Sequence, residues 1–200
     1  MRRFWKDVTV AREDSGFALR LDARPVRTPG RIALLLPAPA LAEAVAREWR
    51  DAPDTVDPRA MPLTGLANAA IDRIAPDRAA FAAGLAAYGE SDLLCYRAEG
   101  PAPRSSRARR RTGTPLLDWA RGRYDVHFEV QAGVMHRPQP PATVARLGEA
   151  VAALDAFRLA GLSPLVTVSG SLIVALALIE GAADRETGWR AARVDEEWQA

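Results

Sequence analysis

The side chains best suited to metal binding or catalysis are few and scattered in this sequence. Its one cysteine is Cys95, and its two histidines, His127 and His136, lie nine positions apart. A metal site needs several thiolate, imidazole or carboxylate ligands that converge on one point. The sequence favours two ordinary, partly exposed histidines instead, so we expect no metal and no cofactor.

The candidate nucleophiles lie in apolar surroundings. Cys95 follows Leu93 and Leu94, which favours a packed thiol over a reactive one. Ser169 and Ser171 lie in the most apolar part of the chain, where a hydroxyl usually bonds to a backbone carbonyl one turn back. The sequence has no G-x-S-x-G elbow, no P-loop and no G-x-G-x-x-G segment. We therefore predict that the protein is not an enzyme.

Two other functions are kept as alternatives. Asp92 and Asp118 could form the carboxylate pair of a small hydrolase, although any chain with this many acids offers such pairs. Arginines concentrate at residues 104–111 and could bind RNA phosphates. Prolines and serines beside this tract indicate an exposed loop, and no aromatic residue within it could stack on bases. Without the tract, acidic residues would outnumber basic ones, so the alkaline pI depends on this one segment.

The first third of the chain has the pattern of a small sheet. Short apolar or alternating runs occupy residues 8–11, 17–21 and 32–36. Turns with Gly and Pro separate them, which favours three or four antiparallel strands. Leu41, Val45 and Trp49 then recur at four-residue steps, along one side of a helix. We expect this helix to cover the sheet, making residues 1–62 the first domain.

The remainder, residues 63–200, has the pattern of a mainly helical bundle. Thr64 is expected to cap its first helix, and Thr114 with Pro115 to begin a later one. The run at 165–179 is shorter than the roughly 20 residues of a membrane span, so we expect one buried central helix. Further expected elements are a strand at 126–130 and helices at 116–124, 144–154 and 182–200. The predicted fold class is therefore α+β, a small antiparallel sheet domain with a covering helix followed by a helical bundle.

Composition is consistent with a soluble protein of a reducing compartment. The chain has 200 residues, 48% of them hydrophobic, which is enough to bury a core. A single cysteine excludes an internal disulfide. No apolar segment follows Arg2 and Arg3, so we expect no signal peptide and a cytoplasmic location.

Several segments, in order along the chain, resemble one family. They are RFWKDV at 3–8, LDARPVRTP at 21–29, the helix at 41–49, MPLTGLANAAID at 61–72, DLLCYR at 92–97, PLLDW at 115–119, GSL at 170–172 and DEEWQ at 195–199. The second segment is similar to the family's LDGRPVKTP. Together they resemble the Atp-twelve family, the assembly chaperones of the ATP synthase catalytic head that bind the α subunit. Residues 104–114 depart from the family pattern, which is what a short out-of-frame reading in a GC-rich gene would produce. The family also continues beyond the position of Ala200 with a further acidic segment.

The resemblance implies a chaperone of the F-type ATP synthase. Such a protein would shield the unassembled α subunit until the β subunit replaces it, with no nucleotide or nucleophile. It implies a bacterial cytoplasmic protein, with a matrix location for eukaryotic relatives. We expect a monomer that binds neither nucleic acid nor membrane.

Six residues are candidates for contact with the α subunit. Asp195, Glu196 and Glu197 would form an acidic edge beside Trp198, unless they are a solvated face beside a core tryptophan. Tyr96 and Arg97 are of types enriched at binding hot spots. The other reading of Arg97 is an internal ion pair with Asp92.

Overall fold

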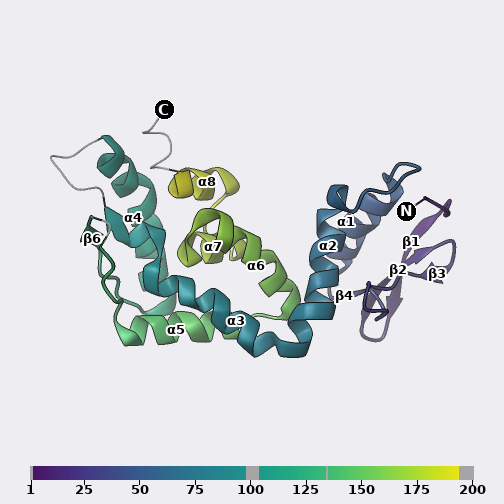
Figure 1. Cartoon of the computed structure of the whole chain (residues 1–200), viewed down its shortest axis with the longest axis horizontal. Coiled ribbons are helices and arrows are strands. Elements are labelled where there is room, and N and C mark those ends of the chain that lie inside the picture. Colours follow the sequence, from purple (N-terminus) through teal and green to yellow (C-terminus); the bar gives the residue numbers. More distant parts are fainter. Residues whose placement is uncertain (1, 98–103, 134, 194–200) are drawn as a thin grey trace. The chain divides into compact units, whose positions relative to one another are not determined.

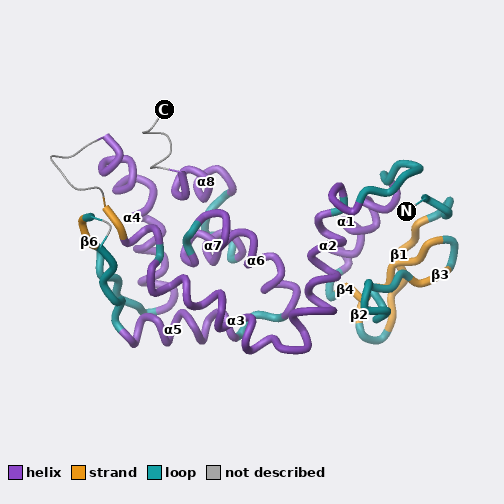
Figure 2. The backbone as a smooth tube through the Cα atoms, viewed as in Figure 1, coloured by secondary structure: helices purple, strands orange, loops and turns teal. Residues whose placement is uncertain are grey.

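The computed structural model describes residues 2–97, 104–133 and 135–193, with side chains at all of these except 97, 104–113 and 132. The chain forms two compact units, residues 1–77 and residues 78–200. Figures 1 and 2 show strands in the first unit and mostly helices in the second, which confirms the α+β class. The division falls later than the expected boundary after residue 62, because the helix that follows Met61 packs against the covering helix of the sheet.

The first unit is built on an antiparallel sheet. Its strands are β1 (Val8–Glu13), β2 (Gly16–Leu21), β3 (Arg24–Pro25) and β4 (Leu35–Leu36). Strand β2 is central, with β1 on one side and with β3 and β4 both pairing to it. Gly16 is required where β2 begins, because a Cβ there would lie 2.7 Å from the Leu36 carbonyl oxygen. The sheet buries Leu19, Leu21 and Leu36.

Helix α1 (Pro39–Arg50) packs against β1 and β2, as its four-residue repeat predicts. It is followed by η1 (Pro58–Ala60), α2 (Pro62–Ala69), η2 (Ala70–Ile74) and η3 (Ala75–Asp77). Thr64 does not cap α2, which begins two residues earlier with Met61 at the capping position. The Glu48 carboxylate of α1 performs the capping, accepting hydrogen bonds from the Leu63 and Thr64 N–H groups at 2.7 and 2.8 Å.

The second unit is mainly helical. Its elements are α3 (Arg78–Ala86), η4 (Ala87–Ser91), η5 (Leu93–Cys95), β5 (Tyr96–Arg97), α4 (Arg104–Tyr124), β6 (Gln131–Ala132), α5 (Pro141–Ala152), α6 (Ala156–Ser169), α7 (Leu172–Ile179) and α8 (Arg185–Arg193). The centre of the core is α7, whose residues 172–177 are all buried. Cys95 is buried too, as expected for a packed thiol.

The most apolar run is two helices and not the single central helix that we expected. Helix α6 ends where Gly170 adopts a left-handed conformation with φ +65°. Ser171 then caps α7 by accepting a hydrogen bond from the Val174 N–H at 3.0 Å. The Ser169 hydroxyl donates to the Leu165 carbonyl oxygen at 2.6 Å, as predicted for a serine in this setting. None of the helices in the described part of the chain is both long and apolar enough to cross a bilayer.

Helix α4 also differs from the sequence-based expectation. It begins at Arg104 and contains Pro115, whereas we expected an exposed loop and a helix starting at Pro115. Arginine is a good helix former, which favours the helix before Pro115, while Pro115 itself removes one N–H donor and crowds the carbonyl one turn back.

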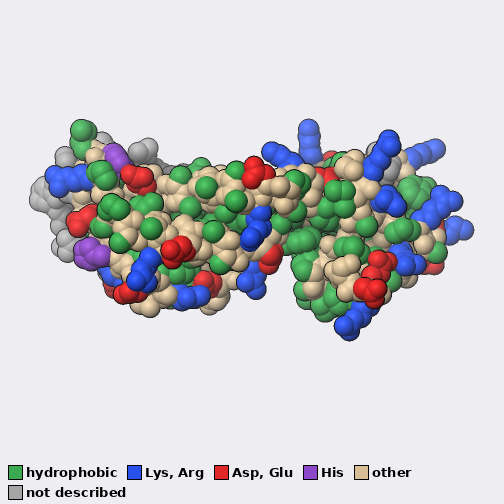
Figure 3. All heavy atoms as spheres, turned by 90° about the horizontal axis from the view of Figure 1, so that it is seen from below, with side chains coloured by type: hydrophobic (Ala, Val, Ile, Leu, Met, Phe, Trp, Pro, Cys, Tyr) green, Lys and Arg blue, Asp and Glu red, His purple; other side chains and the backbone are tan. Residues whose placement is uncertain are grey.

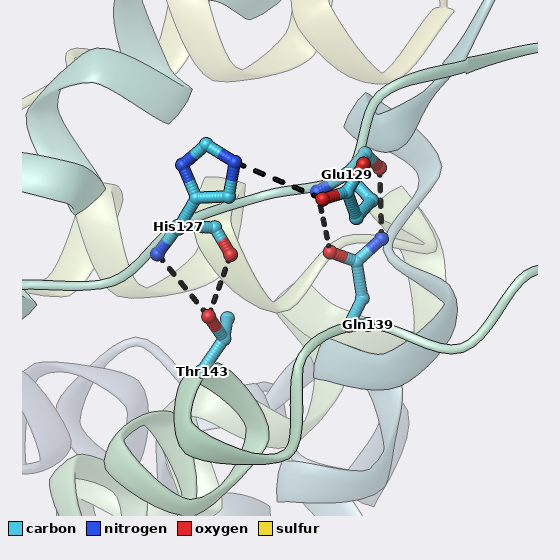
Figure 4. Close-up of polar contacts among 4 residues, drawn as sticks. All are labelled: His127, Glu129, Gln139 and Thr143. Carbon is cyan, nitrogen blue, oxygen red and sulfur yellow. Dashed lines mark hydrogen bonds and ion pairs between the residues drawn. The ribbon is translucent and has the colours of Figure 1, made fainter.

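The expected strand at 126–130 is instead an extended segment without a neighbouring strand, and β6 follows it. Two side chains hold this segment, Gln139 just before α5 and Thr143 in the first turn of α5, as Figure 4 shows. The Gln139 amide bonds to both the N–H and the C=O of Glu129, and the Thr143 hydroxyl bonds to both groups of His127. Val126 and Phe128 are therefore turned into the core, while His127 and Glu129 stay exposed.

Candidate protein-binding surface

The second unit carries an apolar groove between α6, α7 and α8, which we call the α6–α8 groove. It has a volume of about 370 Å³. Its apolar lining comes mainly from Leu165, Val168, Val174, Leu178, Trp189 and Ala192. Arg185 and Glu186 stand where α8 begins.

Close helix packing forms the floor of this groove. Gly188 faces Leu178, and a Cβ at position 188 would lie 3.0 Å from the Leu178 methyl carbons. Glycine therefore lets α8 approach α7 closely, with Trp189, the next residue, at the edge of the contact. Arg123 and Tyr124 at the end of α4 hold Glu180 at the end of α7, each through a hydrogen bond of 2.7 Å. Desolvation raises the pKa of Tyr124, so its hydroxyl remains a donor to Glu180.

Two large apolar residues of the groove face solvent. Val168 is 74% exposed and Trp189 is 49% exposed. The Arg193 guanidinium lies 4.8 Å from the centre of the Trp189 ring, which orients the indole by a cation–π contact. Tryptophan and arginine are enriched among residues that dominate binding energy. This combination makes the groove a candidate contact site for another protein.

A buried carboxylate fixes the start of α7, the helix that forms the floor of the groove. Asp92 is fully buried, and its oxygens accept hydrogen bonds from the Ser171 hydroxyl at 2.7 Å and the Ile173 N–H at 3.0 Å. A third bond comes from the Leu94 N–H at 3.0 Å. Burial raises the pKa of Asp92, and these hydrogen bonds oppose that shift. Asp92 thus joins the DLLCYR segment to the GSL segment.

The six residues predicted from the sequence do not form one described site. Asp195, Glu196, Glu197 and Trp198 lie outside the described residues. Tyr96 and Arg97 form β5, which pairs in parallel with β6. The Tyr96 hydroxyl lies 3.2 Å from the His136 Nδ1, a contact that the sequence did not predict.

The predicted internal pair of Asp92 with Arg97 stays a prediction, because the Arg97 side chain is not among the described ones. The described partners of the Asp92 carboxylate are backbone N–H groups and the Ser171 hydroxyl. Asp92 and Asp118 also differ in setting, because Asp118 is an exposed partner of Arg121 at 2.6 Å. Among the described residues, no group of three or more Cys, His, Asp or Glu side chains could hold a metal ion.

Sequence reasoning missed the groove. The available signal was the Gly188–Trp189 pair in an otherwise charged helix, since glycine permits close packing and a lone large aromatic needs a neighbour. On the face drawn in Figure 3, hydrophobic side chains are interspersed with charged ones. The described residues of this face therefore offer no broad apolar patch, and the α6–α8 groove is kept as the candidate for contact with a partner.

Comparisons with known proteins agree with the motifs. The model of a family described as ATP12 chaperone protein matches residues 2–121. Two structures of Atp12 from Paracoccus denitrificans, one of them a point mutant, are 46% and 45% identical to this chain, each with a TM-score of 0.94. The alignments cover 100% of this chain and 85% of each of those chains. A structure of a candidate chaperone from Agrobacterium tumefaciens is 38% identical with a TM-score of 0.93, over 100% of this chain and 75% of that one.

Proposed function

This chain belongs to the ATP12 chaperone protein family, and on that premise we propose that it assists assembly of the F-type ATP synthase by binding the unassembled α subunit. It shields apolar surface of α that would otherwise aggregate, and the β subunit then takes its place. The work is done by contact and not by catalysis.

The observation that carries this proposal is the α6–α8 groove, with Val168 and Trp189 exposed on a rigid frame. A chaperone must hold its client and also release it. A small apolar groove with one aromatic anchor suits that requirement, because affinity depends on a few well-placed anchors more than on area.

Six further residues are proposed as contacts with α. Asp195, Glu196, Glu197 and Trp198, which lie outside the described residues, would form an acidic contact edge for a basic patch on α. Tyr96 with Arg97 would add a second point of contact. The double variant Trp198→Ala, Glu196→Lys is expected to lose co-purification with α. Full retention of α by this variant would remove the acidic edge from the proposal.

The decisive experiment measures light scattering of isolated α subunit on dilution from denaturant. An equimolar amount of this protein is expected to suppress the scattering, and adding β subunit is expected to release α into an α–β complex. An equal amount of serum albumin is the control. If α aggregates as fast with this protein as with albumin, the proposed function is wrong.

A further inference from the structure

We propose that the α6–α8 groove accepts an amphipathic helix that carries apolar side chains beside an acidic residue. The inference rests on the proposed function and specifies which kind of client segment the groove holds. It depends on three features of the described residues: the backbone around the groove, its apolar lining and the charges along one rim.

The backbone around the groove favours a helical ligand over an extended one. Helices α6, α7 and α8 form its walls, and backbone N–H and C=O groups within a helix bond to each other. An extended peptide would find no strand edge to pair with at these walls and would leave its own backbone unpaired against apolar side chains. A helical peptide satisfies its own backbone and needs to offer only side chains.

The lining determines what the helix must place inside. Leu165, Val168, Val174, Leu178 and Trp189 present aliphatic and indole carbon, and the volume of about 370 Å³ suits a few apolar side chains. Residues three and four apart on a helix lie on one face, so a 3-4 spacing of leucines would fill the groove.

The charges differ between the two rims. The second half of α6, residues 161–169, has no charged side chain. Helix α8 has Arg185, Arg190 and Arg193 against one acid, Glu186, which bonds to Arg190 at 2.8 Å. Asp184 lies just before α8, and hydrogen bonds from Thr187 lower its pKa, so it stays ionised and adds a second negative charge. Residues 184–193 therefore carry three arginines and two acids, a net charge of +1, and an acidic residue beside the apolar face would lie against Arg185 in the lining.

A peptide-binding experiment tests the pairing. The probe is a fluorescein-labelled designed 18-residue helical peptide with leucines at 3-4 spacing and a glutamate on each side of the leucine face. A matched peptide has lysines in place of those glutamates. Fluorescence anisotropy is expected to show up to about fivefold tighter binding of the glutamate peptide, the upper end of the effect of one exposed ion pair.

Variants of the groove test its apolar lining and its charge separately. Trp189→Ala is expected to weaken binding of the glutamate peptide by about 30-fold, as loss of a hot-spot residue does. Val168→Glu should weaken it clearly, whereas Thr167→Glu, an equally charged change on the adjacent exposed residue, should have little effect. Arg185→Glu should reverse the preference toward the lysine peptide, and Arg158→Glu at the other end of α6 should not.

Three results would overturn the inference. They are equal affinity for both peptides, equal effects of Val168→Glu and Thr167→Glu, and a concentration-dependent dimer in light scattering that Trp189→Ala abolishes. The last result would assign the groove to a second copy of this chain. Each can occur while aggregation of α is still suppressed, so failure of this inference is distinct from failure of the proposed function.

Discussion

The sheet unit and the helical unit differ in what their distinctive side chains contact. In the sheet unit, Glu48 and Asp72 belong to recognisable segments, and both accept hydrogen bonds from backbone N–H groups of other segments. Glu48 caps α2, and Asp72 accepts hydrogen bonds from the Thr28 hydroxyl at 2.6 Å and the Gly30 N–H at 2.8 Å. In the helical unit, Val168 and Trp189 point outward, and the groove lies beyond residue 121, where the match to the family model ends. Glu48 and Asp72 therefore belong to the frame, and the α6–α8 groove lies outside the recognisable segments.

The largest effect is expected from Asp92, a recognisable residue that lies inside the helical unit. Asp92→Asn keeps the shape of the side chain but places an amide NH2 donor against a backbone N–H donor. The unfolding free energy should therefore fall by about 3 kcal/mol. Urea denaturation followed by circular dichroism measures this. Asp118→Asn, an exposed acid in an i,i+3 pair, is the control and should cost less than about 0.5 kcal/mol. Equal losses would contradict the distinction between frame and surface.

The same pair of proteins gives a pH test. Because the folded pKa of Asp92 is raised by burial, the folded state binds more protons than the unfolded state above pH 3.8. The contribution of this carboxyl to stability is therefore complete below pH 3.8 and is lost as pH rises through the folded pKa. The stability difference between the wild type and Asp92→Asn should shrink over that range. A difference that grows with pH would mean that the three hydrogen bonds outweigh burial.

A smaller loss is expected for Glu48 in the sheet unit. Glu48→Ala removes the acceptor for two N–H groups and the Thr64 hydroxyl, and should cost about 2 kcal/mol. Glu43→Ala, which removes an exposed pair with Arg50 on the same helix, is the matched control and should cost under about 1 kcal/mol. Suppression of α aggregation per folded molecule should be unchanged in both, and loss of it in Glu48→Ala alone would make this residue part of the binding surface.

A gain is expected at the turn between β2 and β3. Asp22 and Ala23 have φ of 48° and 69°, as in a type I′ turn, and the related family segment has glycine at the second position. Ala23→Gly should therefore stabilise the protein by about 1 kcal/mol, seen as a higher melting temperature. Ala142→Gly in the exposed first turn of α5, where φ is helical, should destabilise instead. The same sign for both would argue against strain at the turn.

The smallest effect on stability is expected at the groove. Val168→Glu alters an exposed side chain, so the unfolding free energy should change by less than about 1 kcal/mol, including the cost of a negative charge near a helix C-terminus. Suppression of α aggregation should nevertheless decline. A variant that folds normally and protects α as well as Thr167→Glu does would place the client elsewhere on the molecule.

The sequence predicted local periodicity well and long-range partners poorly. The helix at 41–49 and the β1–β2 hairpin followed from alternation and four-residue steps, which are properties of neighbouring residues. The break at Gly170 and Ser171 was missed because an apolar run does not show where a helix ends, and the Asp92 carboxylate that meets Ser171 lies far away in sequence.

The candidate site could be predicted only in part. Tyr96 was chosen for its residue type, but its neighbour His136 depends on how β5 and β6 pair. The Gly188–Trp189 pair was the one signal of the groove in the sequence, and the exposure of Val168 could not be predicted because it depends on how α6, α7 and α8 pack. The family resemblance identified the class of protein, and the groove became visible only in the fold.

Residues 127–129 are held by two side chains and not by a neighbouring strand. A strand ladder tolerates most substitutions because its bonds come from the main chain. Here the Gln139 amide and the Thr143 hydroxyl make the backbone hydrogen bonds that a neighbouring strand would otherwise make. Loss of either side chain through a single substitution would therefore release half of this attachment, whereas the same substitution in a strand ladder would leave the main-chain bonds in place.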